Sequence, residues 1–206
     1  NAYETSKTVL SGLGHKLVEV DFSELTSGIC SYYVIAPAEC SSNLSRFDGV
    51  KYGYRSKGAK DIANLYMNTR SDGFGDEVKK RILIGTHVLS AGFYDAYYLQ
   101  AQKVRRMIKL KFENFFKDVD LIFMPTTLDQ AFEKNRKSDD PNRMYKEDLL
   151  TIPANLAGLP AISFPNGFKN NLPIAGQLIG KYFGEDLLLN TTNKIQEVTD
   201  WHKMTP

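Results

Sequence analysis

Charged residues that stand in apolar or aromatic stretches are the residues of this sequence best placed to do chemistry. Arg81 lies in KKRILIG, Asp148 in EDLLTIPAN and Asp95 in GFYDAYY. Because a buried charge is costly unless it is paired, each of them is exposed, part of a structural ion pair, or part of a binding site. On residue type alone, an exposed or structural role is the simpler interpretation for Arg81 and Asp148. For Asp95 we expect a helix cap or a partner for a neighbouring tyrosine.

The sequence lacks the short motifs that mark a nucleophile, a phosphate-binding loop or a metal site. It has no Gly-x-Ser-x-Gly, no Cys-x-x-Cys and no His-Glu-x-x-His. Cys30 and Cys40 do not have a metal-ligand spacing and are expected to be reduced thiols. The three histidines are too scattered to predict a metal site. The residues therefore offer no nucleophile with an adjacent base.

Length and composition are those of a globular domain or of part of one. The chain has 206 residues, of which 42% are hydrophobic and 24% charged. A net charge of +2 is too small to predict binding to nucleic acid or membrane. The sequence begins NAYETSKTVL, without an initiator Met or a leader pattern, so we expect the chain to begin inside a longer protein.

The order of predicted elements is typical of an α/β fold. An exposed loop is expected over 133–143, and the connection between the last two strands is expected to be longer than a tight hairpin. Helices are predicted over 2–11, 31–44, 60–71, 76–116 (with a break near 90–92) and 185–199, with a short one in 148–158. Strands are predicted over 16–22, 119–125, 161–165 and 174–180, with 119–125 buried on both faces of a parallel or mixed sheet.

The second part of the long helical region is amphipathic. Its apolar stripe consists of Val104, Ile108, Phe112 and Phe115. Its cationic side chains could touch RNA phosphates, although a solvated helix face is the commoner reason for such a pattern. These cations are Lys103, Arg105, Arg106, Lys109 and Lys111.

Several motifs in order resemble one family. The stretches are APAECSSNLSRFDGVKYG, GFGDEVKKRILIGT, MPTT and ANLAGLPAISFP. The chain is similar over nearly its whole length to the carboxy-terminal half of the A subunits of tRNA-dependent Glu-tRNA(Gln) amidotransferases, within the amidase signature family. The resemblance implies that residues 1–206 are the carboxy-terminal part of a single amidase domain, an α/β fold with a mixed sheet flanked by helices.

The resemblance also implies an activity. The family's A subunit is a glutaminase that supplies ammonia for converting Glu-tRNA(Gln) to Gln-tRNA(Gln), which makes the whole enzyme a ligase with amidase activity. Its Lys-Ser-Ser triad lies in the amino-terminal half, so we expect no catalytic residue in this chain and no hydrolysis by it alone. The alternatives are a general amidase acting on an unrelated amide and a non-catalytic docking fragment.

The site residues that the resemblance implies belong to the glutamine pocket. Arg81 matches the family's arginine for the α-carboxylate, and Asp148 matches the acidic partner of the α-ammonium. A pocket tyrosine matches Tyr32 or Tyr33, of which we choose Tyr32. Two charges far apart in the chain then suit the two charges of one ligand.

Partners and location are likewise implied by the family. We expect B and C subunits, Glu-tRNA(Gln) handled through the complex, and no membrane. No cofactor or metal is expected on this chain, because ATP and Mg²⁺ are used by the B subunit. The expected location is the bacterial cytoplasm or the matrix of an organelle.

Overall fold

The computed structural model describes residues 2–132 and 147–205, and it divides into two compact units. Residues 1–29 and 105–206 form the sheet unit, and residues 30–104 form the helical unit. Helices α2 (Gly28–Leu44) and α5 (Leu99–Phe115) contribute residues to both units. The loop predicted for 133–143 lies outside the described residues.

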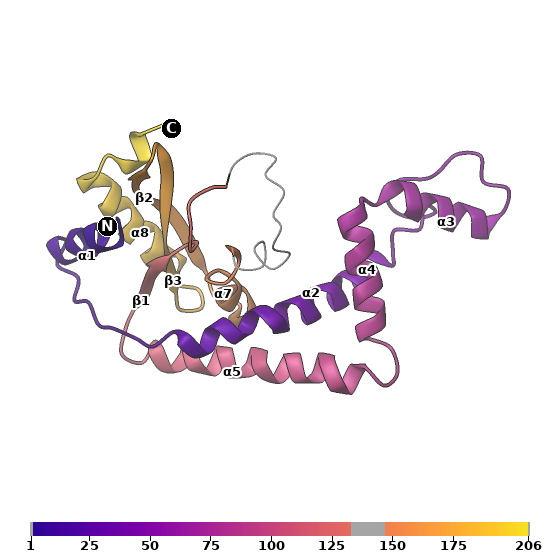
Figure 1. The fold of residues 1–206 in the computed structure, drawn as a ribbon, viewed down its shortest axis with the longest axis horizontal. Coiled ribbons are helices and arrows are strands. Elements are labelled where there is room, and N and C mark those ends of the chain that lie inside the picture. Colours follow the sequence, from indigo (N-terminus) through magenta and orange to yellow (C-terminus); the bar gives the residue numbers. More distant parts are fainter. Residues whose placement is uncertain (1, 133–146, 206) are drawn as a thin grey trace. The chain divides into compact units, whose positions relative to one another are not determined.

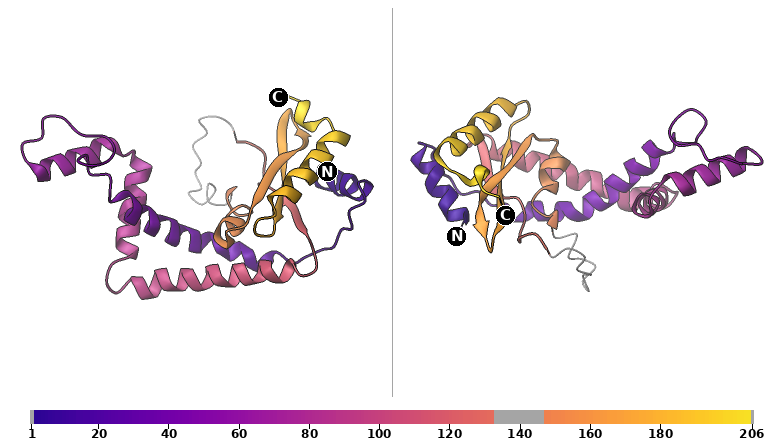
Figure 2. Two further views of the ribbon diagram at one scale, coloured as in Figure 1. Left: turned by 180° about the vertical axis from the view of Figure 1, so that it is seen from behind. Right: turned by 90° about the horizontal axis from the view of Figure 1, so that it is seen from above.

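The sheet unit is built on three antiparallel strands in the order β1-β3-β2. These are β1 (Leu121–Pro125), β2 (Ala161–Lys169) and β3 (Leu172–Gly180). Helices α1 (Ala2–Gly12) and α8 (Glu185–Val198) lie beside each other and pack against β2 (Figure 1, Figure 2). Leu10, Phe164, Leu178, Leu188 and Ile195 are the buried core between them.

The amphipathic part of α5 also belongs to the sheet unit. Ile108 is 0% exposed and Phe112 1% exposed, which confirms the predicted apolar stripe. Gly28 lies at the start of α2, where an added Cβ would meet the Ile108 Cδ1 atom at 2.9 Å. The short helices η1 (Ser23–Ser27), α7 (Ile152–Ala157) and η3 (Trp201–Lys203) complete the unit.

The helical unit contains α3 (Ile62–Gly73), α4 (Asp76–Val88) and a π-helical turn, η2 (Tyr94–Tyr98). Helix α3 is capped by Asp61, whose side chain accepts a hydrogen bond from the Asn64 backbone N–H at 2.7 Å. The predicted break after α4 is confirmed, and Gly92 adopts a φ of 87° there. A left-handed backbone of this kind is open to glycine at little cost, which is why the helix stops at this point.

Three expectations about strands differ from the structure. Residues 16–22 form no strand, and Leu17 and Val18 are 42% and 52% exposed. An alternating pattern makes a strand only beside another strand, and none of the described strands pairs with this segment. Instead, the Asp21 carboxylate accepts from the Ser23 N–H at 2.9 Å and turns the chain into η1.

The hairpin between β2 and β3 is tighter than expected. Asn170 and Asn171, with φ of 52° and 60°, form the two-residue turn, so the prediction of a longer connection is wrong. The Asn166-Gly167 pair, a residue combination common in turns, lies at a bulge inside β2 between Pro165 and Phe168.

The strand predicted for 119–125 is confirmed as β1, with Ile122 and Met124 buried. Its neighbour among the described strands, β3, is antiparallel, which a mixed sheet allows. Leu121, Phe123 and Pro125 are only partly buried, so the expected burial on both faces is not met. The predicted α/β fold class is confirmed by helices packed on this sheet.

Candidate functional site

The crossing of α2 and α4 fixes the position of Arg81. A Cβ added to Gly85 of α4 would stand 1.9 Å from the Pro37 carbonyl oxygen of α2. Only glycine allows the two helix backbones to approach this closely. Beside the contact, the Ser41 and Thr86 hydroxyls are hydrogen-bonded at 2.9 Å. Arg81 lies one turn before Gly85, so the crossing holds its guanidinium close to α2.

Arg81 is oriented by an ion pair within the helical unit, and a tyrosine lies near it. Its Nε donates to the Glu77 carboxylate at 3.1 Å, one turn earlier on α4. The Tyr32 side chain of α2 lies near enough to the guanidinium to affect its pKa. The Glu77 carboxylate, and then the Tyr32 hydroxyl, raise the pKa of Arg81 above its ordinary value, so the guanidinium is positively charged at any physiological pH.

The geometry leaves Arg81 able to bind an anion. Its side chain is 39% exposed. Because Nε is used by Glu77, the terminal nitrogens are the part of the guanidinium that can hold a carboxylate with two parallel hydrogen bonds. The ion pair with Glu77 is also what an exposed or structural role predicts, so the binding of a ligand by Arg81 stays a prediction.

Of the two candidate tyrosines, Tyr32 is the one that raises the pKa of Arg81. The rings of Tyr32 and Tyr33 pack edge to face at 5.1 Å, which limits the movement of the Tyr32 ring. This arrangement favours Tyr32 as the pocket tyrosine. Its contact with glutamine stays a prediction.

Asp148 lies in the sheet unit, in the turn before α7. Its backbone carbonyl accepts from the N–H groups of Thr151 and Ile152, at 3.2 Å and 3.0 Å. These bonds satisfy N–H groups at the start of α7 and hold the Asp148 backbone, while its side chain is exposed. Asp148 and Arg81 belong to different units, so the convergence of their side chains on one ligand stays a prediction.

Gln177 of β3 supports the turn that carries Asp148. Its side-chain amide donates to the Leu150 carbonyl at 2.9 Å and to the Pro125 carbonyl at 3.2 Å. Gln177 is 2% exposed. Sequence reasoning missed this residue, although an amide inside the apolar run IAGQLIG is a signal of a buried polar contact.

Replacing Gln177 with methionine is expected to lower the free energy of unfolding by about 1–3 kcal/mol. Methionine keeps the length of the side chain but removes both N–H donors, which leaves the Leu150 and Pro125 carbonyls without this partner. Urea denaturation measures the loss. The control is Gln196→Met on α8, because the Gln196 side chain makes no hydrogen bond with other described residues. An equal change in both variants would contradict this role of Gln177.

Other predicted features come out differently. Within the described part of the chain, the Asp95 side chain is exposed and has no hydrogen bond or ion pair, so its predicted role as a cap or tyrosine partner is wrong. The cationic face of α5 is partly engaged in structure. Arg105 donates to the Leu156 carbonyl at 2.9 Å, and Lys111 pairs with Glu24 at 3.0 Å.

The cysteines and the possible metal ligands of the described residues do not form clusters. Cys30 and Cys40 are free. No group of three or more His, Cys, Asp or Glu side chains converges within residues 2–132 and 147–205. No helix in those ranges combines the length and apolar character that a bilayer crossing requires.

Comparison with known proteins places these observations in a family. A model of the amidase family matches residues 1–189. The chain is 55% identical over 205 residues to the A subunit of the Glutamyl-tRNA(Gln) amidotransferase of Hahella chejuensis, covering 100% of this chain and 42% of that protein. It is 54% identical over 203 residues to the corresponding subunit of Coxiella burnetii, again covering 42% of the relative.

Solved structures agree with the sequence relatives. The crystal structure of the Glutamyl-tRNA(Gln) amidotransferase A subunit from Thermotoga maritima is 37% identical, with a TM-score of 0.71 and coverage of 100% of this chain and 40% of that one. A 6-aminohexanoate cyclic dimer hydrolase shares the fold at 19% identity and a TM-score of 0.69. The chain therefore spans about two fifths of the length of the proteins it matches.

Proposed function

This chain belongs to the amidase family, and from that premise we propose that it is part of the glutaminase subunit of a tRNA-dependent amidotransferase. The whole protein hydrolyses glutamine, and the ammonia converts Glu-tRNA(Gln) to Gln-tRNA(Gln). The observation that carries the proposal is the 55% identity, over 205 residues, to the A subunit of a Glutamyl-tRNA(Gln) amidotransferase.

In this proposal the chain binds the amino-acid end of glutamine. Arg81 holds the α-carboxylate through its terminal nitrogens, and Tyr32 and Glu77 keep the guanidinium in one orientation. Asp148 receives the α-ammonium. Pairing with both α-groups selects a free amino acid over an uncharged amide, because an amide without those charges leaves both side chains unmatched.

Catalysis in this proposal takes place on residues of the whole protein outside this chain. A serine of the Lys-Ser-Ser triad attacks the side-chain amide, ammonia leaves, and water releases glutamate from the acyl-enzyme. Backbone N–H groups stabilise the oxyanion of each tetrahedral intermediate. The role of this chain is to position the side-chain amide carbon by binding the α-carboxylate and the α-ammonium of glutamine.

The proposed assembly includes B and C subunits. The B subunit takes the ammonia and uses ATP and Mg²⁺ to activate Glu-tRNA(Gln), so this chain itself needs no cofactor or metal. The location proposed for the assembly is the bacterial cytoplasm or, for an organelle homologue, the matrix.

The test is the release of ammonia by the whole protein, with its B and C subunits, from glutamine and from butyramide. Butyramide has the reacting amide and neither charge. We expect kcat/KM to be at least about 100-fold higher for glutamine, because a site built for polar groups rejects analogues that lack them. Similar values for both amides would support a general amidase. Capture of the B subunit by a whole protein that hydrolyses neither amide would support a docking role.

A further inference from the structure

The segment 46–60 of the helical unit concentrates positive charge in a chain whose net charge is only +2. It contains one carboxylate, Asp48, and five cationic side chains, namely Arg46, Lys51, Arg55, Lys57 and Lys60. The Asp48 carboxylate accepts from the backbone N–H groups of Val50 and Lys51, at 2.8 Å and 3.2 Å. Its hydrogen-bonding capacity is therefore used largely inside the loop.

The loop is held in one shape by α3. Arg70 donates from Nη1 to the carbonyls of Leu44 and Phe47, at 2.9 Å and 3.1 Å. The Thr69 hydroxyl accepts from the Ser56 N–H at 3.1 Å. Because these bonds fix the backbone, the exposed side chains of the loop are presented at little further cost in backbone entropy.

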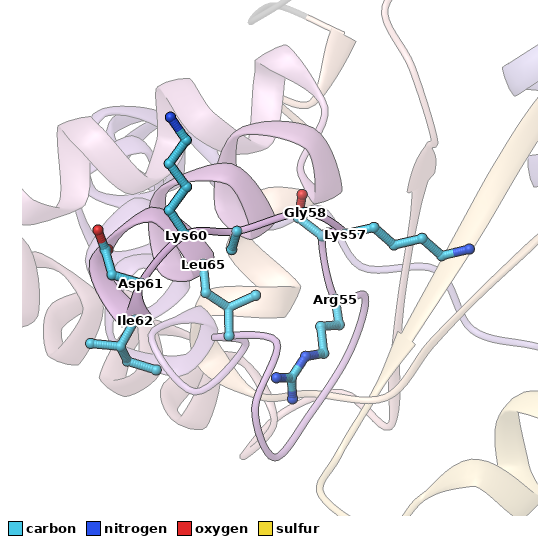
Figure 3. A pocket seen from close by; sticks show the side chains of 9 residues that line it. Arg55, Lys57, Gly58, Lys60, Asp61, Ile62 and Leu65 are labelled. Carbon is cyan, nitrogen blue, oxygen red and sulfur yellow. The ribbon is translucent and has the colours of Figure 1, made fainter.

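Three of the cations are without partners among the described residues. Arg55, Lys57 and Lys60 make no hydrogen bond or ion pair with the residues in 2–132 and 147–205. They line or border an open hollow of ≈ 670 Å³. Figure 3 shows the side chains of Arg55, Lys57 and Lys60 spreading in different directions. Because they diverge, they cannot all hold one small anion. They suit a polyanion that passes across the loop.

Exposed tyrosines lie among these cations. Tyr52 and Tyr54 are 48% and 55% exposed. The Lys51 ammonium lies 5.5 Å from the centre of the Tyr52 ring. The Tyr54 ring is backed by α3, because a Cβ added to Gly73 would meet its Cδ1 atom at 3.2 Å. A ring supported on one side and exposed elsewhere can stack on a nucleobase.

We propose that residues 46–60 bind a single-stranded segment of RNA, with Arg55, Lys57 and Lys60 on phosphates and Tyr52 and Tyr54 against bases. The inference deepens the proposed function, on which it rests for the presence of an RNA partner. Interleaved cations and exposed aromatic rings favour RNA over an acidic protein, which has no bases to stack. On α5, by contrast, Arg105 and Lys111 are occupied by Leu156 and Glu24.

The test measures binding of a fluorescein-labelled 20-nucleotide oligouridylate to the full chain by anisotropy, at several salt concentrations. Neutralising Arg55, Lys57 and Lys60 together to glutamine is expected to weaken binding about tenfold at 50 mM salt. It should also reduce the slope of log K against log salt by about 2, as the loss of three phosphate contacts on a single strand predicts. Tyr54→Ala is expected to weaken binding about tenfold, with little change in that slope.

The matched control removes the same charge elsewhere, by changing Lys103, Arg106 and Lys194 to glutamine. All three are exposed and, within the described residues, make no ion pair. Equal loss of binding in the control, no binding by the unaltered chain at 50 mM salt, or equal competition by polyglutamate would overturn the proposal. The measurement is RNA binding, so its result is independent of the test of glutamine hydrolysis. Either proposal can be contradicted while the other holds. Thermal melting confirms that each variant is folded.

Discussion

Replacing Arg81 with alanine is expected to lower kcat/KM for glutamine by about 10- to 150-fold in the whole protein. This range corresponds to the loss of a charged hydrogen bond of about 1.5–3 kcal/mol to the α-carboxylate. The rate with butyramide should not change, because that amide has no carboxylate for Arg81 to hold. Arg81→Lys should recover only part of the loss, since an ammonium cannot make the bidentate contact.

Lys80→Ala is the control for Arg81. Lys80 is the neighbouring cation on α4, and it is exposed and unpaired with the other described residues. The alanine at position 80 should leave both substrates unaffected. If Arg81→Ala and Lys80→Ala gave the same kcat/KM for glutamine, the assignment of Arg81 to the substrate would be wrong.

Replacing Gly85 with alanine is expected to destabilise the fold by about 3 kcal/mol, at the upper end of the usual cost of overpacking. The new Cβ would stand 1.9 Å from the Pro37 carbonyl oxygen and 2.7 Å from the Ser41 Cβ. A backbone carbonyl cannot rotate away, so the two helices must separate. For a chain of this size the melting temperature should fall by about 6–12 °C.

The control for Gly85 is Gly12→Ala, at the end of α1. An added Cβ there has no neighbour within 4 Å, so alanine is expected to be neutral or slightly stabilising. Scanning calorimetry measures both variants. A Gly85→Ala protein with the same melting temperature as the parent would contradict the close α2–α4 contact. It would then also remove the reason given for the position of Arg81.

Local patterns predicted the helices well, and the failures lie where distant residues decide. Apolar spacing and glycine located α1, the break at Gly92 and the buried stripe that includes Ile108. The segment 16–22 alternates as a strand does, but strand formation depends on a neighbouring strand that the pattern cannot supply. The tight hairpin between β2 and β3 was not predicted. It depends on Asn170 and Asn171 both adopting the left-handed backbone, a conformation that asparagine tolerates better than most residues.

The candidate site was predictable in part. Arg81 was found as a charge among apolar residues, and the family resemblance gave it a role. Its partner Glu77 was missed, although a glutamate four residues before an arginine is a sequence signal of a helical ion pair. The closeness of Gly85 to Pro37 could not be predicted, because nothing in either local sequence tells which helix the glycine will face.

The central claim is that Arg81 and Asp148 bind opposite charges of one amino acid. The most direct measurement is kcat/KM for glutamine, glutaramate and 4-aminobutanamide, with the parent, Arg81→Ala and Asp148→Asn. Glutaramate lacks the α-ammonium, and 4-aminobutanamide lacks the α-carboxylate. We predict that Arg81→Ala lowers kcat/KM for glutamine and glutaramate but not for 4-aminobutanamide. Asp148→Asn should lower kcat/KM for glutamine and 4-aminobutanamide but not for glutaramate. If each variant lowered the values for all three amides by the same factor, the claim would be contradicted.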